Sequence, residues 1–404
     1  MTYRRITLKT KYVIIIPDGA ADEPIEAFDG KTVIEAAETP NIDRIAMDGK
    51  QGLVRTVPEG MTAGSDVAQM SLLGYDPTQC YSGRAPIEAA AMEIPLDPKD
   101  WVFRCNLVTF ADDKMADHSA GHISTDEAKT LITDLAEALN EIYGIRFYTG
   151  VSYRHLFVVS DREFDVTTQP PHDIIGKKIA KNMPKGKNAD FLNDIMARSQ
   201  QLFENHEINR VRRDLGENAA SSVWFWGQGR KAALERFSTR FGLKGAAITA
   251  VDLVRGLAKL IGFDLIEVEG ATGYLDTNYQ GKAEAAIEAI KDYDVVFVHI
   301  EAPDEAGHAG NAAAKKKALE NIDEYIVGPV YEAIKQYDSY RILVMPDHPT
   351  PVATQAHSDE PVPFAMAGTS LEAIVPKPFS EKNALDSGFS VEKGHELMEY
   401  FLKV

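Results

Sequence analysis

Tyr12-Val13-Ile14-Ile15-Ile16-Pro17-Asp18-Gly19 is an apolar run that ends in a proline, a carboxylate and a glycine. Runs rich in β-branched residues are typical of strands that are buried on both faces of a parallel sheet. Open α/β sheets build their sites from the loops beyond the carboxyl ends of such strands. An aspartate directly after this run therefore predicts that a site begins at Asp18.

Four further strings place a metal-ligand type or a nucleophile just after a strand-like run. They are Gly64-Ser65-Asp66, Asp304-Glu305-Ala306-Gly307-His308, Pro346-Asp347-His348 and Ala356-His357-Ser358. With Asp18 they extend over about 340 residues, yet loops at one edge of a sheet can converge. Together they predict a two-metal site for phosphoryl transfer around a serine.

The first and last parts of the chain alternate strand and helix patterns, as a parallel sheet covered by helices requires. The expected strands are Tyr12 to Ile16, Ala246 to Val251, Leu265 to Val268, Asp294 to Ile300, Arg341 to Met345 and Pro363 to Ala367. The expected helices include Val67 to Leu73, Asp252 to Ile261, Lys282 to Lys291, Ala312 to Gln336 and Val391 to Leu402. These elements predict one doubly wound α/β unit with a mostly parallel sheet and helices on both faces.

The middle of the chain has a different pattern. Its expected strands are Trp101 to Phe110, Arg154 to Ser160 and Ser222 to Trp226, and its expected helices are Thr125 to Glu141 and Ala189 to Asn209. Ser124 and Glu127 fit a capping box before the first of these helices. Linker-like stretches at Gln79 to Pro86 and Gly227 to Gly229 predict a smaller inserted α+β domain, residues 87–230, that splits a metal-binding domain of residues 1–86 and 231–404.

The composition of the chain excludes some classes of binding partner. The chain has 404 residues, of which 44% are hydrophobic and 26% charged, with a formal charge of −18. Nucleic acid is not an expected partner, because phosphate backbones are held by clustered Lys and Arg. Cys80 and Cys105 are too few for a disulfide framework or a thiolate zinc site. An acidic protein that handles a small phosphorylated substrate needs local positive charge, which bound divalent cations supply.

No membrane partner is expected either. The basic start at Arg4 and Arg5 leads into an apolar run that Pro17 and Asp18 interrupt, whereas a signal core needs about 7 to 15 apolar residues. No stretch approaches the roughly 18 residues that span a bilayer. The expected location is the cytoplasm, and the sequence does not indicate the oligomeric state.

The candidate ligands are three Asp and three His, with no thiolate. Asp304 and His308 share one helix face at spacing i, i+4, whereas the neighbours Asp347 and His348 meet a metal only if the chain turns there. Mixed carboxylate and imidazole ligation suits manganese, zinc or iron, and magnesium less well. Coordination of Ser65 would favour its alkoxide, and a phosphoserine there would lie at a helix N-terminus.

The chain resembles a known protein family. The strings PDGAAD, TAGSDVAQMSLLGYDP, YSGRAPIEA, EAPDEAGHAGN, MPDH and HSDEPVPF are similar to those of archaeal-type cofactor-independent phosphoglycerate mutases of the alkaline phosphatase superfamily. The resemblance covers essentially the whole chain and implies an alkaline-phosphatase-like fold.

The resemblance also implies roles. Asp18, Ser65, Asp347 and His348 would hold one metal ion, and Asp304, His308 and His357 the other, with manganese expected and zinc, magnesium or cobalt as alternatives. Ser65 would take the phosphoryl group from phosphoglycerate and return it to the other hydroxyl of an enclosed glycerate. No bisphosphoglycerate is needed. The inserted domain is expected to close over the metal domain to exclude water.

Holding the glycerate carboxylate and moving a proton require further residues, most of them in the insertion. Guanidinium groups match carboxylate and phosphate in two-point contacts, whereas lysine contacts phosphate as a point charge. The candidates are Arg84, Arg104, Asn106, His118, His122, Arg154, His155, Arg230 and Lys282.

One segment departs from the family. Where archaeal members typically have D-R-R-A-G-R-I, this chain has Asp117-His118-Ser119-Ala120-Gly121-His122-Ile123. Replacement of arginine by histidine removes a permanent positive charge, which fits a less anionic substrate. The alternative function is therefore that of a homoserine kinase-like phosphotransferase or a metal-dependent phosphatase. The chain has no G-x-x-x-x-G-K-[ST] loop for a nucleotide.

Simpler structural roles compete with several of these assignments. Ser65 can be an ordinary helix N-cap, and His118 and His122 can be solvated loop residues. The arginines can make ion pairs, Trp224 and Trp226 can pack in a core or an interface, and Lys315 to Lys317 have the composition of a solvated helix face.

Overall fold

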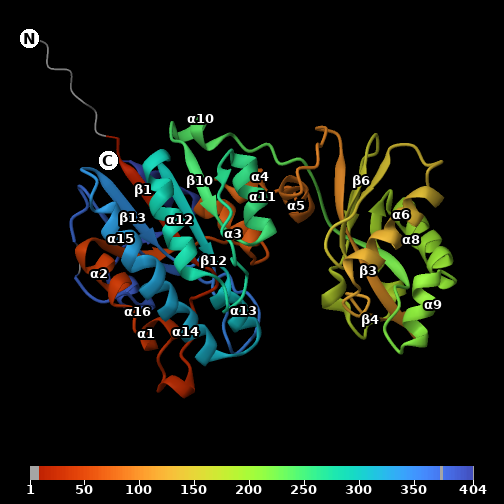
Figure 1. Cartoon of the computed structure of the whole chain (residues 1–404), viewed down its shortest axis with the longest axis horizontal. Helices are drawn as coiled ribbons and strands as arrows, with labels where there is room; N and C mark the ends of the chain where they lie inside the picture. Colours follow the sequence, from red (N-terminus) through yellow and green to blue (C-terminus); the bar gives the residue numbers. More distant parts are fainter. Residues whose placement is uncertain (1–8, 374–375, 404) are drawn as a thin grey trace, which may run out of the picture. The chain divides into compact units, whose positions relative to one another are not determined.

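The computed structural model describes residues 9–373 and 376–403. These residues form two compact units, one made of the described chain up to Tyr81 and from Ala233 onward, and the other made of Ser82–Ala232 (Figure 1). Each unit has its own sheet and its own hydrophobic core. In the described part of the chain, no helix is long and apolar enough to cross a bilayer.

The first unit is built on an eight-stranded sheet with the order β11-β10-β12-β1-β13-β14-β2-β15. Among its strands, β14 alone runs antiparallel to both neighbours. The bounds are β1 (Lys11–Pro17), β2 (Lys50–Val54), β10 (Gly245–Ile248), β11 (Asp264–Leu265), β12 (Val295–Ile300), β13 (Tyr340–Val344), β14 (Val362–Gly368) and β15 (Ser390–Val391). The prediction of a mostly parallel α/β sheet is confirmed.

Helices cover both faces of this sheet (Figure 1). Val13 and Ile15 of β1 pack in one core with residues of α1 (Val33–Ala36), α2 (Pro40–Asp48), α12 (Tyr279–Asp292), α14 (Ala312–Ile322) and α15 (Gly328–Ile334). On the other face, Tyr12 meets Phe401 of α17 (His395–Leu402), which contacts α3 (Ser65–Leu72), and α3 contacts α11 (Asp252–Ile261). The remaining helices are η1 (Glu26–Phe28), α4 (Pro77–Cys80), α10 (Phe237–Phe241), α13 (Ala302–His308) and α16 (Glu381–Asp386).

Three expectations for this unit need correction. The predicted helix Val391 to Leu402 begins only at His395, because Val391 pairs with Val54 of β2 as part of β15. The predicted helix Ala312 to Gln336 is interrupted by a π-helical turn, Asp323–Val327, where buried Asp323 accepts hydrogen bonds from the backbone N–H groups of Asn41 and Ile42. Lys315 is not solvated: its side chain is fully buried and its ammonium pairs with Asp22 at 2.7 Å. Helical periodicity placed this lysine on the correct element but gave no sign of its buried partner.

The second unit is an antiparallel sheet in which β3 (Trp101–Ala111) pairs with β4 (Lys114–Asp117), β6 (Arg154–Val159) and β9 (Ser222–Arg230), and β5 (Ile145–Tyr148) pairs with β6. A separate ribbon joins β7 (Asp165–Thr167) to β8 (Lys185–Lys187). The helices are α5 (Arg84–Ala91), α6 (Thr125–Ala138), η2 (Pro171–Ile174), α7 (Ile179–Asn182), α8 (Ala189–Glu204) and α9 (Glu207–Asp214). Apolar residues of α6 and α8 share one core with Phe103, Phe157 and Phe225 of the sheet.

The capping box before α6 is present, since the Ser124 hydroxyl accepts from Glu127 N and the Glu127 carboxylate accepts from Ser124 N. The expected helix Ala189 to Asn209 is instead two helices, because His206 caps the start of α9. Gly227 to Gly229 are not a linker but part of β9. A Cβ on Gly229 would lie 2.0 Å from Ser82 O, so glycine lets the two backbones approach there.

Candidate active site

Three adjacent parallel strands, β12, β1 and β13, bring the acidic strings together. Asp18 directly follows β1, Asp304 lies in α13 just after β12, and Asp347 follows β13. Asp18 and Asp347 are completely buried, and Asp304 is 3% exposed. Carboxylates at this depth need a counter-charge or hydrogen-bond donors, which makes their surroundings informative.

Asp18, Asp347 and His348 form the first cluster, with ligand atoms that all lie within 4.8 Å of one another. His348 Nε2 is 3.5 Å from Asp18 Oδ1 and 3.5 Å from Asp347 Oδ2. Asp18 Oδ1 is buried and has no hydrogen-bond partner among the described residues. Burial and then the Asp347 carboxylate raise the pKa of Asp18 well above its usual value. A divalent cation would satisfy this unpaired oxygen and the repulsion between the carboxylates.

Asp304, His308 and His357 form the second cluster. Asp304 lies 3.3 Å from His308 Nε2 and 3.5 Å from His357 Nε2, and the two imidazole Nε2 atoms are 2.9 Å apart. Ligand atoms of Asp304, His348 and His357 also lie within 4.8 Å of one another, so His348 borders both clusters. Without a metal ion, the hydrogen bond to Asp304 raises the pKa of His308 to about 9.

The far nitrogens of two histidines show how the rings are oriented. His308 Nδ1 lies 3.0 Å from Gln355 O, and His348 Nδ1 lies 3.3 Å from Pro349 O. A carbonyl only accepts, so each Nδ1 carries a proton, and when the ring is neutral its bare Nε2 faces the cluster. Metal-ligating histidines are held in this way, and the residues present therefore fit two divalent cations.

Ser65 is the first residue of α3 and is not its N-cap, which is Gly64. Its hydroxyl lies 3.1 Å from His348 Nε2, at the edge of the first cluster. An ordinary capping serine would use its oxygen for a backbone N–H of the next turn. The serine side chain is instead directed at the ligand cluster.

Other groups hold these ligands from behind, and the sequence did not point to them. Gln69 Nε2 donates to Asp347 Oδ2 at 2.9 Å, and the Thr350 hydroxyl donates to Asp304 Oδ1. Buried His299 lies 2.7 Å from Asp18 Oδ2. Burial lowers the pKa of His299 to about 3, so this ring is neutral. The partners of these groups lie 46 to 281 positions away in the sequence, which is why these contacts appear only in the folded chain.

Glu301 is a further acidic group next to the first cluster. Its Oε2 is buried, has no hydrogen-bond partner in the described chain and lies 3.6 Å from His299 Nε2. Burial, followed by the neighbouring Asp304 carboxylate, raises the pKa of Glu301 to about 8. Lys282 is close to it but only 1% exposed, and its ammonium donates to His299 O at 3.1 Å. That position favours a structural role for Lys282 over a phosphate contact.

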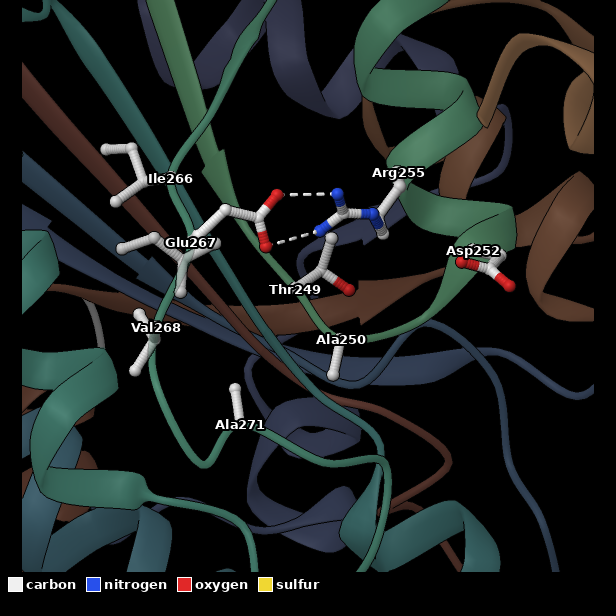
Figure 2. A pocket seen from close by; sticks show the side chains of 9 residues that line it. Thr249, Ala250, Asp252, Arg255, Ile266, Glu267, Val268 and Ala271 are labelled. Atoms are coloured by element: carbon white, nitrogen blue, oxygen red, sulfur yellow. Dashed lines mark hydrogen bonds and ion pairs between the residues drawn. The ribbon is translucent and has the colours of Figure 1, made fainter. Parts of the chain in front are cut away.

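A pocket of about 290 Å³ lies beyond the carboxyl ends of β10 and β11 (Figure 2). Thr249 lines it, and the Thr249 hydroxyl lies 3.2 Å from His299 Nδ1. Arg255 and Glu267 form a two-point ion pair across one wall, with distances of 3.0 and 2.6 Å. Thr249 therefore lies between the pocket and the histidine that contacts Asp18.

Candidate substrate residues of the second unit lie on one face of its sheet. Arg104 and Asn106 of β3 are in register with Trp226 and Trp224 of β9, and Asn106 is in register with Arg154 of β6. The Arg104 guanidinium stacks on Trp226 at 3.9 Å, and Glu88 accepts from Nε of both Arg84 and Arg104. Trp224 and Trp226 are buried, as expected for packing residues.

Histidines border this group. His118 lies 5.6 Å from the ring of Tyr153 and 6.1 Å from His172, and His172 lies 5.3 Å from Trp226. His122 is 6.2 Å from Tyr153. Burial lowers the pKa values of His118 and His172, so both rings are mainly neutral at pH 7. His172 was not singled out from the sequence.

His155 and Arg230 are placed differently. His155 is in register with Cys105 and Phe225, on the face that α6 and α8 cover, and its Nδ1 accepts from Gly150 N. Burial lowers the pKa of His155 to about 4. Arg230 pairs with Glu163 and lies over the Trp101 ring. The alternation of side chains along β6 thus separates His155 from its neighbour Arg154.

The chain is similar to proteins of one known family. Residues 46–209 match the family model described as 2,3-bisphosphoglycerate-independent phosphoglycerate mutase. Enzymes of that name from Methanothrix thermoacetophila and Methanosarcina barkeri are 47% and 48% identical to the chain, over 97% of its length and 99% of theirs. A Geobacter sulfurreducens protein with the same name, qualified as probable, is 47% identical over the same shares.

Two solved structures are also similar. A Pyrococcus horikoshii protein has a TM-score of 0.81 at 30% identity and covers 98% of this chain and 97% of its own. A cofactor-independent phosphoglycerate mutase from Thermoplasma acidophilum has a TM-score of 0.67 at 25% identity and covers 97% and 99%.

Proposed function

Because this chain belongs to the family of 2,3-bisphosphoglycerate-independent phosphoglycerate mutases, we propose that it interconverts 2- and 3-phosphoglycerate through a phosphoserine at Ser65. The observation that carries this mechanism is the position of the Ser65 hydroxyl, 3.1 Å from His348 Nε2 and at the edge of the carboxylate and imidazole clusters. A site that only bound metal would have no use for a serine in that place.

Two divalent cations are part of the proposal. Asp18, Ser65, Asp347 and His348 would hold one, and Asp304, His308 and His357 the other. Manganese suits this donor set best, and zinc, magnesium or cobalt are alternatives. When bound, such ions draw negative charge from the phosphoryl group and favour loss of the Ser65 proton.

The chain's own residues supply the rest of the reaction. The Ser65 oxygen attacks phosphorus, the serine–phosphorus bond forms, and the bond from phosphorus to the glycerate oxygen breaks as that oxygen takes up a proton. The N-terminus of α3 would then stabilise the phosphoserine, because the helix dipole favours negative charge there. Attack by the other glycerate hydroxyl, which gives up its proton, regenerates Ser65.

For the inserted domain, residues 87–230, we propose a substrate-binding role with closure over the metal domain. The support is the shared face of Arg104, Asn106 and Arg154, with Arg84 bonded to the same glutamate as Arg104. Guanidinium groups would bind the glycerate carboxylate. The substrate class also supports a cytoplasmic location, since phosphoglycerates are intermediates of glycolysis.

Phosphorus NMR of the manganese-loaded protein with 3-phosphoglycerate alone tests the proposal. The expected result is appearance of 2-phosphoglycerate without added bisphosphoglycerate, and its loss in Ser65→Ala and after chelation. Ser71→Ala, on the same helix, is the matched control and keeps the reaction. Turnover only with ATP and homoserine would instead establish a phosphotransferase, and release of inorganic phosphate a phosphatase.

A further inference from the structure

His299 is a fully buried histidine in the apolar strand β12, where an aliphatic side chain would satisfy packing alone. We propose that His299, oriented by Thr249, is a positioning residue that holds Asp18 for the metal ion of the first cluster. This inference rests on the proposed function, because it assumes that Asp18, Asp347 and His348 bind a cation. Its consequence is that His299 selectively sets the affinity of that one ion.

The hydrogen bonds of the His299 ring fit one assignment of donors and acceptors. The Thr249 hydroxyl lies 3.2 Å from His299 Nδ1 and accepts from Val251 N at 3.1 Å. If Thr249 donates to Nδ1, the proton of the neutral ring is on Nε2 and donates to Asp18 Oδ2 at 2.7 Å. Asp18 must be ionised to bind a cation, and beside an ionised carboxylate the opposite tautomer would direct a bare Nε2 at another acceptor in a buried site.

The two oxygens of Asp18 consequently have different tasks. Oδ2 is held by His299, whereas Oδ1 is the buried, unpaired oxygen that lies 3.5 Å from His348 Nε2. The strand end is fixed as well, because the Lys282 ammonium donates to the His299 carbonyl. One carboxylate oxygen is thereby fixed in place, and the other is left to bind the cation.

The second cluster is held by different means. Asp304 accepts from the Thr350 hydroxyl and faces His308 and His357 directly, and no hydrogen bond among the described residues joins it to His299 or Thr249. Loss of the His299 bond should therefore weaken one ion and leave the other unchanged. A purely structural role of His299 would affect both ions, or only the stability of the fold.

A third metal ion is the competing explanation. Ligand atoms of Asp18, His299 and Glu301 also lie within 4.8 Å of one another. The 2.7 Å distance between His299 Nε2 and Asp18 Oδ2 is a hydrogen-bond distance, shorter than the roughly 3 Å between neighbouring ligands of an ion with bonds near 2.1 Å. The geometry thus favours a proton between these two atoms.

The test is a measurement of manganese binding to the full chain. Electron paramagnetic resonance of free Mn²⁺ and calorimetry both monitor the binding. Four variants are compared with the wild type: His299→Leu, His299→Gln, which keeps a donor near Nε2, Thr249→Val, and Thr249→Ser as its matched control. In His299→Leu we expect one dissociation constant to rise about 10- to 100-fold and the other to stay within twofold. His299→Gln and Thr249→Ser should recover most of the affinity, and Thr249→Val should show an intermediate loss at the same ion.

Each other outcome has a definite meaning. Two unchanged constants in Thr249→Val and His299→Leu, or equal weakening of both ions, would overturn the positioning role. Three ions bound by the wild type and two by His299→Gln would replace it with a third metal site. If His299→Leu does not fold, the Thr249 and His299→Gln variants decide the question. If the wild type binds no ion, the two-metal mechanism itself fails.

Discussion

Gly19 shows how closely single residues are fitted around the site. Its backbone has φ +62°, and a Cβ there would lie 2.5 Å from Asp304 Oδ1 and 2.6 Å from the Thr350 hydroxyl. Gly19 N also donates to Asp347 Oδ1 at 3.1 Å. The glycine therefore lets the backbone pass between two candidate ligands, which no other residue permits.

Gly19→Ala should abolish tight manganese binding and reduce mutase activity at least 100-fold, because the methyl group displaces Asp304. We expect a stability loss of about 1 to 3 kcal/mol from the strained conformation and the clash. Gly30→Ala is the control, since Gly30 also has positive φ but its Cβ would meet no described atom within 4 Å. Activity assays and urea unfolding check both variants, and equal activity losses would contradict this interpretation.

Glu381 provides a pH prediction away from the metal ligands. Its Oε2 accepts from the Thr32 hydroxyl at 2.7 Å, and burial raises its pKa to about 7 from an ordinary 4.5. Because the folded pKa is the higher one, the protonated carboxyl contributes stability that is complete below pH 4.5 and is lost as the pH rises to about 7. The loss is at most about 3 kcal/mol.

Urea unfolding of the metal-free protein between pH 4.5 and 8 measures this contribution. In Glu381→Gln the profile should be flatter over that range, and the difference from wild type should be constant above pH 7. A difference that does not change with pH would show that Glu381 titrates normally in the folded state.

Helix α14 contains a buried ion pair that its sequence pattern does not predict. Lys315 lies on the buried face of α14, where its ammonium donates to Asp22 Oδ2, Ala21 O and Thr350 O. Asp22 in turn accepts from Val352 N at 3.2 Å. The buried Lys315 ammonium thus links the loops that follow β1 and β13, next to the candidate metal ligands.

Lys315→Met should cost about 3 to 5 kcal/mol, because it leaves the Asp22 carboxylate buried without its partner. Lys317→Met, at an exposed position of the same helix, should stay within about 0.5 kcal/mol of wild type. Thermal unfolding compares the two variants, and equal effects would refute a special role of the buried pair.

The capping box of α6 gives a second prediction at this scale. Ser124→Ala removes the oxygen that accepts from Glu127 N, so the second unit should lose about 1 kcal/mol. Thr130→Ala on the exposed face of α6 should change stability by less than 0.5 kcal/mol. Chemical denaturation resolves a difference of this size.

The sequence predicted the elements that have strong periodicity and missed those that depend on distant partners. β1, α11 and β12 were located almost to their ends, since continuous apolar runs or helical spacing define them. β2 was missed because its sequence Lys-Gln-Gly-Leu-Val contains a lysine, a glutamine and a glycine. Gly52 is required there because a Cβ would lie 2.4 Å from Phe389 O, a contact with residues more than 300 positions away.

The candidate site divides in the same way. Asp18, Ser65, Asp304 and His308 occur in recognisable strings, and the structure brings them to one edge of the sheet. His299 and Thr350 lie in no such string, because their importance arises from hydrogen bonds to distant residues in the folded chain. His155 shows the opposite error: it adjoins Arg154 in sequence but lies on the other face of β6.

For the whole molecule, two separate cores predict two unfolding transitions. Manganese should raise the midpoint of only one of them, because all candidate ligands belong to the unit that contains β1. At 100 times the dissociation constant the gain is about 2.7 kcal/mol per ion. Asp347→Asn should remove most of this shift in calorimetry, and His118→Asn should not. A single transition that manganese shifts as a whole would show that the units unfold together, and a shift of two separate transitions would show that both units gain stability from the metal.

During synthesis, β1 leaves the ribosome long before the strands with which it pairs. This apolar strand is made first, but its neighbours β12 and β13 begin about 280 and 320 residues later, while the whole of Ser82–Ala232 lies between them. At roughly 5 to 20 residues per second, the nascent strand waits about 15 to 60 s before either partner exists. The contiguous unit has time to fold in that interval, whereas Val13 to Ile16 of the other unit stay without their sheet partners and are open to aggregation.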